Sequence, residues 1–158
     1  MKHEPPPSLR ARLGPAEIAA FASPYLTEGR RQEAWRIDDV VIEGERLEAR
    51  VAMTSTYVSA TDAHGFHLTA FSALEFVSQL VIIYGHVWAG LDRKTREGWL
   101  LEASIRTADA IRNPDRIDVT IVTKSVRRVR DNVLGVSEFT VSDGGGGTFT
   151  GRIKSFLA

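Results

Sequence analysis

The sequence predicts an α+β domain in which one long helix is buried and an antiparallel sheet curls around it. The segment 68–91 is apolar almost throughout, so a helix there must be covered on nearly every side. Two strand-like segments precede it and four follow, separated by turn residues. With 158 residues, 43% of them hydrophobic, the chain is long enough for one domain with a real core.

The first residues, 1–14, are expected to be a disordered tail, which leaves 15–158 as a single domain. Residues 1–7 are charged and proline-rich and lack the apolar core of a signal peptide. A short helix is expected over 15–22, because Pro15 suits a first helical turn and Pro24 follows the segment.

The strands are read from apolar and polar alternation and from the turns between them. A turn at 43–45 separates the first two strands, and turns at 113–115 and 143–147 separate later ones. A short junction is expected at 123–125, and residues 130–132 are either a turn or a bend in one long strand. The expected strands are 35–42, 47–53, 99–108, 116–124, 126–141 and 148–156.

The long apolar segment is expected to be a core helix and not a membrane span. Its 24 residues would measure about 36 Å, which is long enough to cross a bilayer. However, Glu75, Gln79 and His86 interrupt the apolar run that membrane insertion favours. No membrane association is therefore expected.

Composition excludes several classes of partner and chemistry. The net charge is zero and the basic residues are scattered outside 127–130, so no nucleic-acid surface is expected. The absence of cysteine excludes disulfides and thiolate nucleophiles, and we expect a cytoplasmic protein. His64 and His67 have i, i+3 spacing, but no third metal ligand converges on them, so neither a metal nor another cofactor is expected.

One line of polar residues runs along the apolar helix. Ser72, Glu75, Gln79 and His86 recur at helical spacing. Burying a carboxylate costs several kcal/mol unless it is paired or neutralised. Glu75 therefore either pairs with an arginine or tyrosine or takes part in chemistry, whereas His86 is expected to be structural.

A long buried helix inside a curled antiparallel sheet is the hot-dog architecture. The segment 105–119 resembles the strand, turn and strand signature of that superfamily. The resemblance implies a homodimer or a dimer of dimers, with acyl-thioester sites at the interface between two copies.

A closer resemblance covers most of the chain, and its motifs occur in the same order throughout. They resemble the FcoT-type fatty acyl thioesterases, a family that also includes enzymes adding glycine to an enoyl thioester on a carrier protein. The matching pieces are Ala16-Glu17-Ile18, Ser23-Pro24-Tyr25, Glu28-Gly29, Thr54-Ser55-Thr56-Tyr57-Val58, Gly65-Phe66-His67-Leu68-Thr69-Ala70, Ser78-Gln79-Leu80, Gly98-Trp99, Asp143-Gly144-Gly145 and Gly151.

The resemblance implies which residues form the site. The family's two active-site tyrosines match Tyr25 and Tyr57, and its histidine at the start of the central helix matches His67. Thr69 and Ser78 stand where the family has asparagine, so two amide donors are missing here. The predicted catalytic residues are Tyr25, Tyr57, His67 and Glu75, and the predicted substrate-binding residues are His64, Thr69, Ser72, Ser78 and Gln79.

The chemistry can also be argued from the residues alone. A helix that begins near His67 presents free backbone N–H groups to a thioester carbonyl that gathers negative charge. His67 or Glu75 can activate water or an amine, and the tyrosines can donate hydrogen bonds. The glycine run 144–147 lies between two strands, which favours a hairpin turn over a phosphate cradle.

These observations leave three functions open. The first is an enzyme that hydrolyses fatty acyl or enoyl thioesters of acyl carrier protein or coenzyme A, alone or coupled to conjugate addition of glycine or another amine. The second is a 3-hydroxyacyl-carrier-protein dehydratase that uses His67 and Glu75. The third is a non-catalytic subunit that binds acyl chains.

Overall fold

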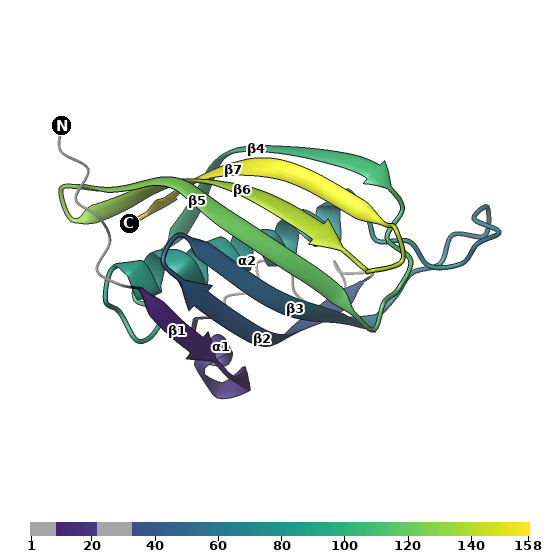
Figure 1. Cartoon of the computed structure of the whole chain (residues 1–158), viewed down its shortest axis with the longest axis horizontal. Coiled ribbons are helices and arrows are strands. Elements are labelled where there is room, and N and C mark those ends of the chain that lie inside the picture. The colour runs from purple at the N-terminus through teal and green to yellow at the C-terminus, as the bar shows by residue number, and fades with distance from the viewer. Residues whose placement is uncertain (1–8, 22–32) are drawn as a thin grey trace.

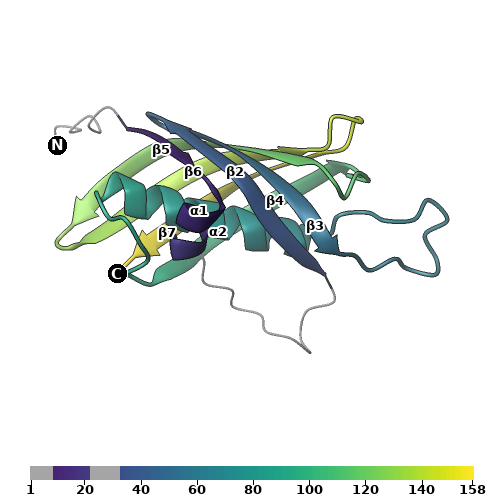
Figure 2. The ribbon, with the colours of Figure 1, turned by 90° about the horizontal axis from the view of Figure 1, so that it is seen from below.

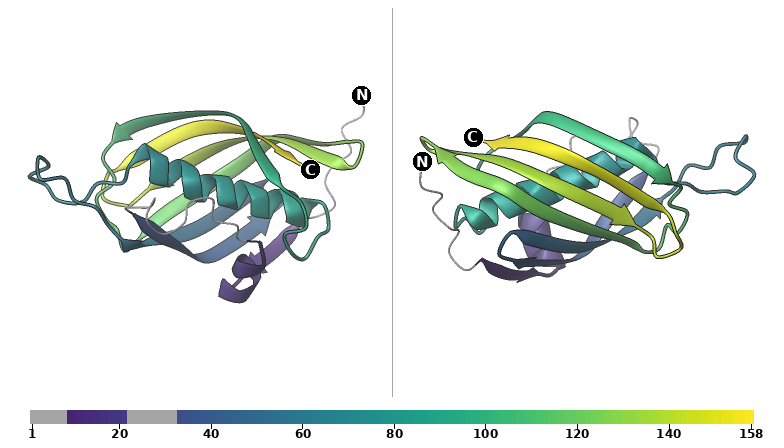
Figure 3. Two further views of the ribbon diagram at one scale, coloured as in Figure 1. Left: turned by 180° about the vertical axis from the view of Figure 1, so that it is seen from behind. Right: turned by 45° about the horizontal axis from the view of Figure 1, so that its top comes forward.

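The computed structural model describes residues 9–21 and 33–158 and confirms the expected architecture. A seven-stranded antiparallel sheet, in the order β1-β2-β3-β5-β6-β7-β4, curves around one long helix (Figures 1 and 3). The helix α2 lies across the concave face of the sheet. The elements are β1 Arg10–Leu13, α1 Pro15–Phe21, β2 Ala34–Glu43, β3 Arg46–Ser55, α2 Ala70–Trp88, β4 Gly98–Asp109, β5 Ile117–Val129, β6 Asn132–Ser142 and β7 Thr148–Leu157.

Helix α2 forms the centre of the core. Thr69 caps its first turn by accepting a hydrogen bond from the amide of Ser72, and the amide of Ala89 closes its last turn onto Gly85. Phe76 and Leu80 are fully buried. α2 is long and apolar enough to cross a membrane by length and composition, yet 61% of its apolar window is buried inside this fold. The core helix therefore accounts for its apolar character.

The β5–β6 hairpin differs from the sequence prediction at one point and decides between two predicted alternatives at another. β5 runs without interruption through the expected junction at 123–125, where a register shift between Thr123 and Ser125 makes a bulge. The junction was therefore wrong. The strands reverse at Arg130 and Asp131, and Arg130 has a positive φ of 57°. Of the two alternatives for 130–132, the turn is confirmed.

The N-terminal tail was predicted to extend too far. Residues 10–13 form β1, which pairs with β2 from Arg10 opposite Glu43 to Leu13 opposite Val40. Leu9 and Leu13 are buried in the main core. The ordered domain therefore begins before residue 15. The expected short helix is confirmed as α1, which lies beside α2 (Figure 2). The rings of Phe21 and His86 join the two helices, with their centroids 5.8 Å apart.

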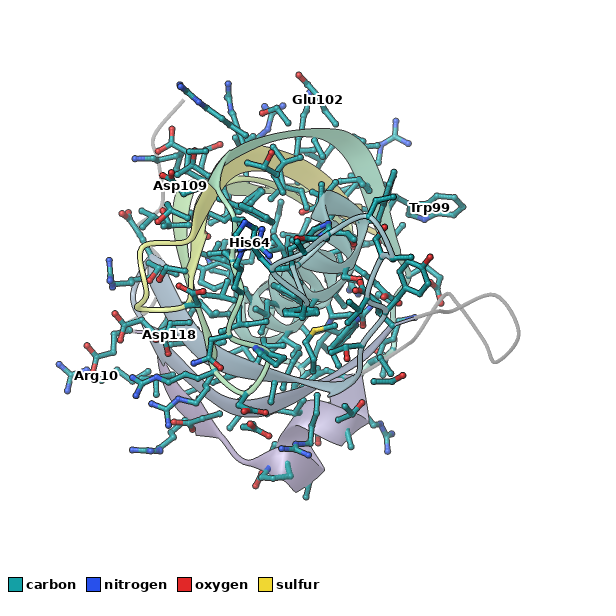
Figure 4. The ribbon with its side chains drawn as sticks, turned by 90° about the vertical axis from the view of Figure 1, so that its right-hand side faces the viewer. Arg10, His64, Trp99, Glu102, Asp109 and Asp118 are labelled. Atoms are coloured by element: carbon teal, nitrogen blue, oxygen red, sulfur yellow. The ribbon has the colours of Figure 1, made fainter. Side chains whose placement is uncertain are left out.

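The strand that follows the helix, β4, forms one edge of the sheet. Within residues 9–21 and 33–158 it pairs only with β7, and its residues are exposed on both faces along most of its length. Trp99, Leu100 and Leu101 are 59%, 51% and 54% exposed. In the view along the molecule, Trp99 stands out from the body (Figure 4). Three successive large apolar residues on a long open edge are unusual for a free surface.

Candidate functional site

The start of α2 offers backbone donors to a ligand. Thr69 satisfies two of the first amides, since its side chain accepts from Ser72 and its carbonyl from Ala73. The amides of Ala70 and Phe71 have no acceptor within the helix, as in any first turn. Phe71 is 86% exposed, so this end of the helix is open to a ligand.

Strand β2 fixes the first two turns of α2 by two side chains on one face. Glu33 directly precedes β2 and Trp35 lies on it, so the two side chains share one face and point toward the helix. The carboxylate oxygen Oε2 of Glu33 accepts hydrogen bonds from the hydroxyls of Thr69 (3.2 Å) and Ser72. The indole Nε1 of Trp35 donates to Oε2 of Glu75 at 2.8 Å, and the Trp35 ring lies edge-on to Phe76. The helix start is therefore anchored to the sheet.

The buried carboxylate of Glu33 was missed in the sequence prediction. Glu33 is only 8% exposed, and a negative charge at a helix start is stabilised by the positive end of the helix dipole. Thr69 and Ser72, both predicted to bind substrate, use their hydroxyls to hold this carboxylate. No local signal marks Glu33, because its partners lie 36 and 39 residues further along the chain.

An apolar cavity of about 370 Å³ lies between α2 and the strands β4 and β7. Glu75 is the charged residue on its wall, and Ser78 is a second predicted residue there. The Ser78 hydroxyl donates to the carbonyl of Leu74 at 2.6 Å. The wall is formed by Phe71, Leu74, Glu75, Ser78, Val81, Ile82, Gly98, Trp99, Leu100, Ile153 and Ser155. A cavity of this composition suits an alkyl chain.

His67 precedes the helix and contacts Asp62 on its own connection, and Arg112 from another segment holds Asp62. Its Nδ1 lies 2.7 Å from Oδ2 of Asp62, on the same β3–α2 connection. Arg112, which follows β4, donates from Nη1 to Oδ2 of Asp62 at 3.2 Å and to the carbonyl of Phe66 at 3.3 Å. The His67 side chain is 43% exposed, so the ring remains accessible.

A second carboxylate fixes the backbone of Arg112. Asp143 accepts hydrogen bonds from the amides of Arg112 and Asn113 and from those of Gly145 and Gly147, all between 2.8 and 3.2 Å. Burial alone raises the pKa of Asp143, but the four amide hydrogen bonds outweigh it and leave the pKa below its ordinary value. The glycine turn is therefore tied to the segment that carries Arg112.

The remaining predicted residues lie in different surroundings. Tyr25 falls outside the described residues. Tyr57 is 54% exposed on the β3–α2 connection, which projects from the body (Figure 1). His64 is exposed on the same connection (Figure 4). Its amide donates to Oδ1 of Asp62. Gln79 is 2% exposed, which places it inside the core.

His86 has the structural role expected for it. It is fully buried, its Nδ1 bonds to the carbonyl of Ile82, and its Nε2 accepts from the amides of Thr95 and Arg96. Burial lowers its pKa, and Lys94 and Arg96 act in the same direction. The ring therefore fastens the α2–β4 loop in its neutral form.

The sequence alone did not point to Asp62 or Arg112. Asp62 stands five residues before His67, so its position within reach of the histidine is a local signal that pattern reading could have used. Arg112 comes to the same place only through the fold, because it is 50 residues from Asp62.

No protein-family model and no curated protein sequence gives a significant match to this chain. Solved structures do match. The dehydratase heterocomplex ApeI:P from Xenorhabdus doucetiae is similar with a TM-score of 0.59 at 16% identity, over 92% of this chain and 91% of that one.

Two further structures contain thioester-related ligands. The protein smu.793 from Streptococcus mutans UA159, bound to acetyl CoA, is similar with a TM-score of 0.53 at 14% identity, over 85% of this chain and 96% of that one. A hypothetical thioesterase protein with coenzyme A from Streptococcus pneumoniae TIGR4 gives 0.52 at 11% identity, over 78% and 85%. At these identities the shared property is the fold, and the predicted hot-dog fold is confirmed.

Proposed function

We propose that this protein is an enzyme that acts on fatty acyl or enoyl thioesters of coenzyme A or acyl carrier protein. One observation carries the proposal: an accessible histidine precedes a buried helix whose side lines an apolar cavity of about 370 Å³. The cavity suits the acyl chain, and the helix start suits the thioester carbonyl. The ligands of the two coenzyme A-containing structures support this class of substrate.

Hydrolysis follows from the placement of these groups. His67 Nε2 accepts a proton from water, and the hydroxide oxygen attacks the thioester carbonyl carbon. The amides of Ala70 and Phe71 donate to the carbonyl oxygen as it becomes negative. When the carbon–sulfur bond breaks, the thiolate takes the proton from His67, so the products are the free acid and the thiol.

Glu75 lines the cavity and therefore faces a bound acyl chain. A carboxylate in that position can remove or add a proton at the carbons next to the thioester, which hydrolysis does not require. Conjugate addition of an amine to an enoyl thioester does require it, and so does dehydration of a 3-hydroxyacyl thioester. This observation favours dehydratase activity as the second candidate, and the similarity to the dehydratase heterocomplex supports it.

The test supplies acyl, enoyl and 3-hydroxyacyl thioesters of coenzyme A and of a carrier protein, each with and without glycine. Mass spectrometry identifies the products. We expect release of free acid by the wild-type protein and a loss of about 10²-fold or more in His67→Gln, because a positioned base contributes about that much.

An exposed residue on the same connection that has no predicted role at the site provides the matched control. Thr61→Ala should retain the wild-type rate if the Asp62-bound ring of His67 is the reacting group. Formation of an enoyl thioester without free acid would favour the dehydratase. Absence of any product from all three substrate classes would overturn the enzymatic proposal.

A further inference from the structure

Asp62 is surrounded by hydrogen-bond donors on both of its oxygens. Oδ1 accepts from the amide of His64 at 2.9 Å, and Oδ2 lies 2.7 Å from His67 Nδ1 and 3.2 Å from Nη1 of Arg112. The side chain is only 15% exposed. The hydrogen bonds from the His64 amide and the His67 ring, followed by Arg112, lower the pKa of Asp62 to about 2. The carboxylate is therefore ionised at neutral pH.

An ionised carboxylate can only accept hydrogen bonds. The short contact between Asp62 and His67 therefore requires a hydrogen on Nδ1 of the imidazole. In the neutral ring the other nitrogen, Nε2, then carries no hydrogen and acts as the proton acceptor. The contact thus selects one of the two tautomers of His67.

Arg112 fixes the carboxylate that selects the tautomer. Its guanidinium binds both Asp62 and the carbonyl of Phe66, the residue before His67. Its own backbone is held by Asp143. The orientation of the His67 ring is therefore determined from a part of the chain far from it in sequence, and not by the exposed connection alone.

We propose that Asp62 and Arg112 are positioning residues for His67. Asp62 keeps the hydrogen on Nδ1 and aims Nε2 at the reacting water, and Arg112 keeps Asp62 in place. This assignment rests on the proposed function, in which Nε2 takes the proton of water and returns it to the thiolate. The Nδ1 hydrogen stays on the ring throughout and is not transferred to Asp62.

The first test reads the tautomer without using activity. In protein labelled with ¹⁵N in its histidine rings, two-dimensional NMR distinguishes a nitrogen that carries hydrogen from one that does not, and His67→Gln assigns the signal. We expect the hydrogen on Nδ1 in the wild-type protein above neutral pH. In Asp62→Asn we expect this preference to be lost, because the amide group can donate to Nδ1.

The second test measures turnover. Asp62→Asn should lower kcat by up to about 10⁴-fold with little change in KM, since the wrong histidine tautomer costs about that much in a serine-protease triad. Arg112→Gln should lower kcat less. The matched control is Asp118→Asn, which removes another arginine-bound carboxylate, on β5.

The outcomes separate this inference from the proposed function. A hydrogen on Nε2 in the wild-type protein overturns the positioning role, even if Asp62→Asn fails to fold. Wild-type turnover in a folded Asp62→Asn protein overturns it as well. A protein that turns over no thioester overturns the proposed function, whereas its ring spectrum still decides whether Asp62 sets the tautomer.

Discussion

At the scale of single residues, the two ionisable groups beside the helix start are held differently. His67 is oriented by a charged partner, Asp62, whereas Glu75 accepts a hydrogen bond from the neutral indole of Trp35. His67 is accessible, and Glu75 lines the apolar cavity. We therefore expect His67 to act on water and Glu75 to act on the acyl chain.

Glu75→Gln tests this division of roles. The amide keeps the shape of the side chain and an oxygen that can accept from Trp35, so the melting temperature should change little. Hydrolysis should persist, whereas dehydration or amine addition should be lost. The measurements are thermal unfolding and product analysis on the same preparation.

Two other results would contradict the expectation for Glu75. A destabilisation of about 3 to 5 kcal/mol would identify Glu75 as half of a buried ion pair, because its partner would be left uncompensated. A stable variant that carries out every reaction of the wild-type protein would show that Glu75 is neither a catalytic group nor half of a buried ion pair.

Single residues also show how far the sequence could predict the site. His67 and Glu75 were predicted from the sequence because His67 shortly precedes an apolar helix and Glu75 interrupts it. Glu33 and Arg112 were not, because their contacts with Ser72 and Asp62 join segments 39 and 50 residues apart. The catalytic roles of His67, Glu75, Tyr25 and Tyr57 all remain predictions.

At the scale of elements, α2 was predicted well because its apolar pattern is long and continuous. β1 was missed because four residues beside a proline-rich segment give a weak pattern, although Leu9, Ala11 and Leu13 alternate as a strand requires. The bulge in β5 was read as a junction because the register shift at Thr123 interrupts the alternation without ending the strand. In both β1 and β5 the pairing with a neighbouring strand, and not the local sequence pattern, determines the structure.

The C-terminal end of α2 should make stability depend on pH through His86. Its pKa is lowered in the folded state, so the unfolded chain binds the proton more readily. This contribution is complete above the ordinary pKa of about 6.5 and is lost as the pH falls below it. We expect the melting temperature to fall between pH 7.5 and pH 5.5.

His86→Leu should remove this part of the pH dependence. At pH 7.5 it should also cost about 1 to 3 kcal/mol, because the amides of Thr95 and Arg96 lose their acceptor. His64→Gln, which changes an exposed ring, should show the same fall of melting temperature with pH as the wild-type protein. If the melting temperature of His86→Leu fell with pH as steeply as that of the wild-type protein, the pH dependence would belong to other groups.

At the scale of the whole molecule, the sheet has one edge that is hard to reconcile with an isolated chain. β4 is long, exposed on both faces and carries Trp99, Leu100 and Leu101. The cavity wall includes Trp99 and Leu100 from this same strand. We expect two copies to pair through β4 about a two-fold axis, which would cover the edge and complete the wall.

Light scattering or sedimentation at micromolar concentration should give twice the 17.4 kDa mass of the chain, or four times for a dimer of dimers. Leu101→Lys should shift the protein toward the monomer. Val129→Lys alters an exposed apolar residue at the end of β5 and should leave the mass unchanged. A monomeric wild-type protein would contradict pairing through β4.

The glycine run after β6 has a consequence for protein engineering. Four successive glycines look like a natural place to insert a tag or open the chain. Here Gly145 and Gly147 donate their amides to Asp143, and a side chain on Gly147 would meet the carbonyl of Ala110 at 2.5 Å. An insertion at this turn should therefore disturb a segment that supports His67, and the Arg130–Asp131 turn is the better place to modify.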